Sequence, residues 1–108
     1  MGYDIHVTRQ RDGDDIQRRL IEAAEWLNYI ESDSELALQE DGQRISALWT
    51  SYGKEGVLPC FIWWRGIIST KNPNRKVLIK ALEIASRLEA RVIGDDAEEY
   101  QSAEDLQE

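Results

Sequence analysis

The hydrophobic pattern of the chain changes period along its length. Residues 3–8 alternate apolar and polar side chains, which is the pattern of a β-strand with two different faces. Apolar residues then recur at helical spacing from Ile16 to Ile30. Asp14 or Asp15 is suited to cap this helix, because a carboxylate accepts the free N–H groups of the first turn. We therefore expect a strand followed by an amphipathic helix.

Four short strands, a second helix and a last short strand are expected in the rest of the chain. Asp41-Gly42 and Gly66 are signals for tight turns, each between two candidate strands. Asn72 and Pro73 predict a helix start, with Asn as the cap and Pro at the first helical position, where its missing N–H costs nothing. The expected strands are 36–39, 44–50, 59–65, 67–70 and 91–93, and the apolar stripe of the second helix runs from Val77 to Leu88.

This order of elements predicts an α+β fold, β-α-β-β-β-β-α-β. We expect a single two-layer domain with a mainly antiparallel sheet of about five strands and two helices. A chain of 108 residues suits one domain, which we assign to residues 1–100, with residues 101–108 as an acidic C-terminal tail. Two helices are expected to cover one face of the sheet. One of the adjacent residues Trp63 and Trp64 would then lie on a more exposed surface, unless loops and the tail bury both.

Charge is distributed unevenly along the chain. The net charge is −8, and residues 94–108 contain 7 acidic residues and no basic residue. This sign disfavours nucleic acid and anionic lipid as partners, so we expect neither. The acidic end is either a solvated tail or an anionic surface offered to a cationic protein, and Tyr100 within it favours the second interpretation.

Few residues are suited to catalysis. The chain has one histidine, His6, which shares a strand face with Asp4, and one cysteine, Cys60, in an apolar run where burial makes a thiol inert. No zinc, EF-hand or phosphate-loop spacing is present. We therefore expect no enzyme activity, no cofactor and no metal, with a small enzyme or ligand-binding protein that uses Asp4 and His6 as the alternative. The beginning of the chain has no signal-peptide pattern, so we expect a cytoplasmic protein.

Several blocks of the sequence resemble a family of small bacterial proteins. The blocks are Met1-Gly2-Tyr3-Asp4-Ile5-His6-Val7-Thr8-Arg9, Glu25-Trp26, Trp49-Thr50, Trp63-Trp64-Arg65-Gly66-Ile67-Ile68, Lys71-Asn72-Pro73 and 90–100. Some proteins that look like this are encoded beside polymorphic toxins and contact-dependent growth inhibition systems, where the small acidic partner is an immunity protein. Relatives often have a tryptophan shortly after the first strand, where this chain has the charged segment 11–15. The resemblance implies no catalytic residues.

Together, charge and resemblance lead to one hypothesis about function. We expect an immunity protein that binds a cognate toxin domain, with a cationic nuclease as the expected class, and covers its active-site groove in a 1:1 complex. A homodimer formed through an edge strand or an exposed aromatic face is a further alternative. The residues expected to contact the toxin are Asp95, Asp96, Glu98, Glu99 and Tyr100, with Asp12, Asp14 and Asp15 as a second patch and Trp63 as an apolar anchor.

Overall fold

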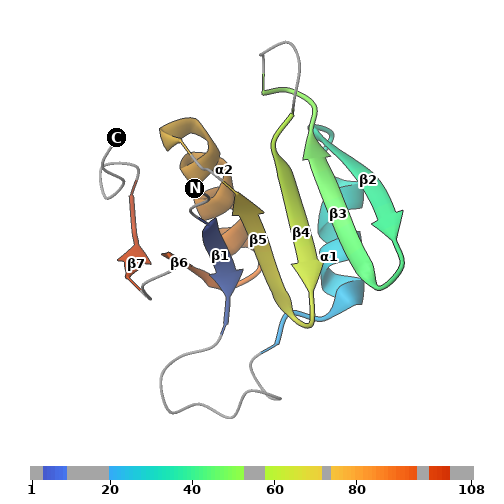
Figure 1. The fold of residues 1–108 in the computed structure, drawn as a ribbon, viewed down its shortest axis with the longest axis horizontal. Helices are drawn as coiled ribbons and strands as arrows, with labels where there is room; N and C mark the ends of the chain where they lie inside the picture. Colours follow the sequence, from blue (N-terminus) through green and yellow to red (C-terminus); the bar gives the residue numbers. More distant parts are fainter. Residues whose placement is uncertain (1–3, 10–19, 53–57, 72–73, 95–97, 103–108) are drawn as a thin grey trace.

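The fold is an open sheet with two helices, as Figure 1 shows. The computed structural model describes residues 4–9, 20–52, 58–71, 74–94 and 98–102. Within these residues the elements are β1 (Asp4–Thr8), α1 (Ala23–Ser32), β2 (Leu36–Asp41), β3 (Arg44–Trp49), β4 (Cys60–Trp64), β5 (Ile67–Lys71), α2 (Arg75–Arg87), β6 (Arg91–Gly94) and β7 (Glu99–Tyr100). The α+β class is confirmed, but the sheet has seven strands where about five were expected. One reason is that Glu99 and Tyr100, assigned to an acidic surface, pair with β6 as a short strand.

All neighbouring strands of the sheet are antiparallel, in the order β2-β3-β4-β5-β1-β6-β7. The first strand in sequence therefore lies inside the sheet, between β5 and β6. The connection from β5 to β6 runs through α2, and the connection from β1 to β2 runs through α1. Strands β2 and β7, which carry acidic residues, form opposite edges of the sheet.

Both helices lie on the same side of the sheet (Figure 1). The strand register assigns each side chain to a face: Val7 is opposite Ile68, and Ile68 is opposite Trp63, so these three face the helices together. The core between the two layers includes Trp26 of α1, Phe61 of β4 and Leu78 of α2, each with no measurable exposure. Among the described residues, neither helix is long and apolar enough to cross a membrane.

Helix α1 begins later than its apolar spacing predicts. Its first residue is Ala23 and its cap is Glu22, whose backbone N–H donates to Glu25 Oε1 over 3.1 Å. The preceding Ile21 donates its backbone N–H to Gly66 O over 3.0 Å, so this part of the chain packs against the β4–β5 turn and is not helical. The predicted start near Ile16 is therefore wrong for residues 20–22. The proposed caps Asp14 and Asp15 lie outside the described residues.

Helix α2 begins at Arg75, two residues after the predicted start at Pro73. The cap is Asn74, whose Oδ1 accepts a hydrogen bond from Val77 N over 2.9 Å. The extended backbone of Asn74, with φ −105° and ψ −175°, does not allow a helix to run through this residue. A second asparagine close to the proline thus supplies the cap that the sequence pattern assigned to Asn72.

Candidate protein-binding surface

The predicted acidic site is only partly described, and its described residues contact other parts of the chain. Tyr100 is buried, with 6% of its surface exposed, and its hydroxyl donates to Glu98 Oε1 over 3.0 Å. Glu99 Oε1 accepts from Arg91 Nη1 over 3.2 Å. Tyr100 is therefore part of the core and not a surface anchor. The remaining predicted acids, Asp12, Asp14, Asp15, Asp95 and Asp96, lie outside the described residues.

Trp63, the predicted apolar anchor, faces the helices. Its indole Nε1 donates to Ile21 O over 2.8 Å, and its ring packs against the buried core. Three strands, β5, β1 and β6, separate it from Glu99, so the structure does not bring these predicted site residues together. We call the face of the sheet opposite the two helices the open face. The tryptophan on this face is Trp64, which is half-buried beneath two guanidinium groups. Arg44 and Arg65 lie 5.4 and 5.0 Å from the centre of its ring.

The histidine has a partner that the sequence did not suggest. His6 is opposite Ser69 in the sheet, and its Nδ1 lies 2.7 Å from Ser69 Oγ. Both side chains belong to the open face, together with Asp4 two residues before the histidine. Such a pair can transfer a proton between serine and imidazole, which is the first requirement of a serine nucleophile.

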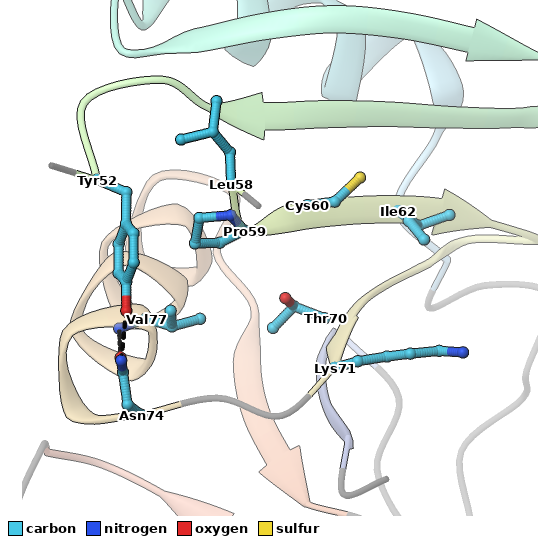
Figure 2. Close-up of a pocket in the computed structure, with 9 residues that line it drawn as sticks. All are labelled: Tyr52, Leu58, Pro59, Cys60, Ile62, Thr70, Lys71, Asn74 and Val77. Carbon is cyan, nitrogen blue, oxygen red and sulfur yellow. Dashed lines mark hydrogen bonds between the residues drawn. The ribbon is translucent and has the colours of Figure 1, made fainter. Parts of the chain in front are cut away.

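A pocket of about 370 Å³ lies between the ends of β4 and β5 and the start of α2 (Figure 2). Strands β4 and β5 are paired only from Ile62 to Trp64, so Cys60 and Lys71 lie beyond the paired stretch. Figure 2 shows Tyr52 and Asn74 together on one side of the pocket, joined by a hydrogen bond from Asn74 Nδ2 to the Tyr52 hydroxyl. Its lining includes neither Asp4 nor His6.

The pocket contains little reactive chemistry. Burial raises the pKa of the Cys60 thiol, although a hydrogen bond with Ser46 opposes this shift, so the thiolate is disfavoured. Lys76, near the same helix start, donates to the backbone carbonyl of Tyr52 and lies 4.9 Å from the centre of its ring. Among the described residues, no three His, Cys, Asp or Glu side chains are grouped so as to hold a metal ion. The pocket is best described as an apolar hollow beside a helix start.

The largest concentration of acidic residues in the described part of the chain lies on α1, on β2 and on the segments next to them. Residues 20–43 contain 7 acidic residues and no lysine or arginine. Four of them, Glu31, Asp33, Glu35 and Glu40, follow the end of α1, the connection to β2 and β2 itself; we call this set the anionic edge. Glu31, Glu35 and Glu40 are exposed. The charge pattern pointed to residues 94–108 and to Asp12, Asp14 and Asp15 and not to this set, although the long stretch without a basic residue was visible.

One buried lysine organises part of the anionic edge. Lys80 of α2 is 4% exposed, and its Nζ donates to Asp33 Oδ2 over 2.7 Å, to Glu35 Oε1 over 3.2 Å and to Glu83 Oε2 over 2.9 Å. Burial alone would lower the pKa of Lys80, but the hydrogen bonds to these carboxylates outweigh it, and the pKa is raised. One positive charge thus faces three negative charges, and the cluster keeps an excess of negative charge.

The aromatic residues around this cluster fix its carboxylates. Tyr29 donates its hydroxyl to Asp33 Oδ2 over 2.9 Å, and Trp49 Nε1 donates to Glu35 Oε1 over 3.0 Å. Burial opposes the charge of Asp33, but hydrogen bonds from Lys80, the backbone of Glu35 and Tyr29 outweigh it, so its pKa is lowered. Burial and, after it, the hydrogen bond to the same carboxylate raise the pKa of Tyr29, which stays protonated. The hydrogen bonds therefore hold Asp33 and Glu35 as carboxylates in fixed positions.

Comparisons with known proteins leave this geometry as the main source of functional information. No protein-family model, no curated protein and no solved structure matches the chain. The anionic edge is the feature that best fits a binding role, because it combines exposed carboxylates with a fixed local framework.

Proposed function

We propose that the chain is an immunity protein that binds a cognate bacterial toxin domain and neutralises it, and that the toxin contacts the anionic edge. The observation that carries this proposal is the absence of any basic residue from 20–43 beside 7 acidic ones. Glu31 and Glu40 add to it, since neither has an ion-pair partner among the described residues. Exposed charges without a partner are the ones that contribute most to long-range attraction.

The chemistry of the expected toxin class supports this assignment. A nuclease holds the phosphates of its substrate with lysine and arginine, so an inhibitor that presents carboxylates competes for the same groups. Opposite charge also raises the association rate, towards about 10⁸ M⁻¹s⁻¹ for a steered encounter. A rapid encounter suits a protein that must act before the toxin reaches its substrate. We propose a cytoplasmic monomer that forms a 1:1 complex and covers the active-site groove of the toxin.

The acidic C-terminal end enters the proposal as a second anionic surface, with Asp95 and Asp96 as its contributing carboxylates. Glu98 and Glu99 contribute less, because their carboxylates contact Tyr100 and Arg91. Glu99 belongs to β7, at the opposite edge of the sheet from β2. A toxin of ordinary interface size would engage one edge first.

The test is co-expression with the toxin domain encoded in the neighbouring reading frame. We expect growth to be restored and a 1:1 complex to be recovered by size-exclusion chromatography with light scattering. The double variant Glu31→Gln/Glu40→Gln should bind the toxin more slowly than the native chain. The control variant Glu89→Gln removes an exposed charge between α2 and β6 and should bind like the native chain. Failure of the native chain to protect or to form a complex at micromolar concentration would overturn the proposal.

A second candidate function is a small hydrolytic enzyme, and the hydrogen bond between His6 and Ser69 favours it. Both residues lie on the open face, away from α1. The variants His6→Ala and Ser69→Ala therefore separate the two functions. An immunity protein should keep its protective effect in both variants, whereas a hydrolase should lose its activity in both.

A further inference from the structure

Strand β2 offers a free edge to an incoming strand. Among the described elements it pairs with β3 alone. Leu36 donates its backbone N–H to Asp33 O over 3.0 Å and not across to β3. In an antiparallel ladder, alternate residues point their backbone N–H and C=O groups to the same side, so Leu38 and Glu40 also direct theirs away from β3. These two residues present donors and acceptors in the spacing that another strand requires.

An apolar groove of about 460 Å³ runs between α1 and this edge. Leu27 and Ile30 of α1 line one side, and Leu36 and Leu38 of β2 line the other. Leu38 is 46% exposed, and it forms a continuous apolar lining with Leu27, Ile30 and Leu36. It is opposite Ala47, which is fully buried on the helix side, so its side chain lies on the face that α1 only partly covers.

The charge around the groove indicates what can occupy it. Glu31 and Asp33 line the groove itself, and Glu40 belongs to the same strand and face as Leu38. A second copy of the chain paired through β2 would bring these carboxylates close to their counterparts, which is destabilising. A segment with lysine or arginine beside apolar residues would instead satisfy both the groove and its carboxylates.

We propose that β2 accepts an extended, basic and apolar segment of the toxin as an added strand. Its backbone pairs with Leu38 and Glu40, alternate apolar side chains enter the groove beside Leu38, and a lysine or arginine lies near Glu31 or Glu40. This inference rests on the proposed function, and it specifies the chemistry of the contacting segment. Backbone pairing supplies affinity at this site, while the groove and the carboxylates select the sequence.

The first test is amide hydrogen exchange of the full chain, alone and in complex with the toxin domain from the neighbouring reading frame. We expect the amides of Leu38 and Glu40 to exchange at least about tenfold more slowly in the complex. Unchanged exchange at both amides within a stable complex would overturn the added strand and leave the proposed function intact. Absence of a complex would overturn both.

Variants of exposed residues give an independent measurement. Leu38→Arg should raise the Kd of the complex about 30-fold, because it removes an apolar anchor and adds a like charge for the basic segment. Ile79→Arg is the matched control, since Ile79 is 55% exposed on α2, outside the groove, and should leave the Kd unchanged. Glu40→Pro removes the outward N–H as well as the carboxylate, so it should raise the Kd about tenfold relative to Glu40→Gln, which removes the charge alone. Equal affinities of Leu38→Arg and Ile79→Arg would contradict the inference.

A defined peptide tests the surface without the toxin. A short extended peptide with valine and lysine at successive positions of one face, and threonine at the positions between them, should shift the backbone NMR signals of Leu27, Ile30 and 36–40. The same peptide with glutamate in place of lysine should shift them much less. Equal shifts with both peptides, or shifts confined to another surface, would overturn the proposed selectivity for a basic segment whether or not the toxin binds.

Discussion

The ammonium of Lys80 lies 2.7 Å from Asp33 Oδ2, although the two residues are 47 positions apart in the sequence. This contact joins α2 to the segment that connects α1 with β2. Because Lys80 is buried, the contact fixes the position of the connection from which Glu35 and the start of β2 extend. The stability of the fold and the geometry of the anionic edge therefore depend on the same ion pair.

Replacement of this lysine should destabilise the protein. Lys80→Met leaves three carboxylates together without a cation, and we expect a loss of roughly 2–3 kcal/mol in the free energy of unfolding. Two of the carboxylates are about half exposed, which limits the penalty. Lys76→Met is the control on the same helix, with an expected loss below about 1 kcal/mol. Urea unfolding followed by circular dichroism measures both, and equal losses would mean that the cluster contributes little.

Stability should be lost on both sides of a broad pH range. The hydrogen bond with Arg9 lowers the pKa of Glu25, and Lys80 lowers that of Asp33, so their contribution is complete above about pH 5 and is lost as the pH falls through the lowered values. The pKa values of Lys80 and Tyr29 are raised, so their contribution is complete below about pH 10 and is lost at higher pH.

The melting temperature measured across this range tests the assignment of these groups. As the pH falls, the melting temperature of Asp33→Asn should decrease less than that of the native chain, because one of the carboxylates that must be protonated is absent. A decrease of the same size in both proteins would show that Asp33 does not contribute to acid unfolding.

Two glycines in hairpin turns should respond differently to alanine. Gly66 has φ +88°, and an added Cβ would lie 2.6 Å from the Cβ of Leu20, so both backbone strain and a steric clash oppose the substitution. Gly42 has φ +61° with nothing within 4 Å, so strain alone applies. We expect Gly42→Ala to cost roughly 1 kcal/mol and Gly66→Ala at least roughly twice as much. Thermal unfolding of the two variants compares them directly, and equal costs would contradict the packing of Leu20 against the turn.

The start of α2 can be tested through its cap. Asn74→Ala removes the acceptor for Val77 N and should cost about 1 kcal/mol. Asn74→Asp keeps this acceptor and adds a negative charge at the helix start, so it should unfold at nearly the native urea concentration. If both variants lost the same stability, the contact of Asn74 with Tyr52 would be the important one and not the cap.

The sequence predicted those parts of the fold that depend on local periodicity. The hairpin turns at Gly42 and Gly66 and the apolar stripe of α2 follow from residues close together in the chain, and each is present. The predicted start of α1 was wrong because the backbone N–H of Ile21 forms a hydrogen bond with Gly66 O. This contact joins residues far apart in the sequence, so no local pattern predicts it.

The candidate site was harder to predict for the same reason. The exposure of Leu38 depends on where α1 ends relative to β2, and the burial of Lys80 depends on carboxylates 45 and 47 positions away. A lysine in a helix normally indicates a solvated surface, so the sequence alone gives no reason to place one in the interior. The stretch of residues 20–43 without a basic residue was the available signal for the anionic edge.

Stopped-flow association with the toxin domain from the neighbouring reading frame, measured over a range of salt concentrations, tests the binding role most directly. For the native chain we expect the association rate to fall about tenfold between low and physiological ionic strength. Glu31→Gln/Glu40→Gln should start from a lower rate and have a weaker dependence on salt, with Glu89→Gln like the native chain. A rate that does not change with salt, or that is the same in all three proteins, would contradict recognition through the anionic edge.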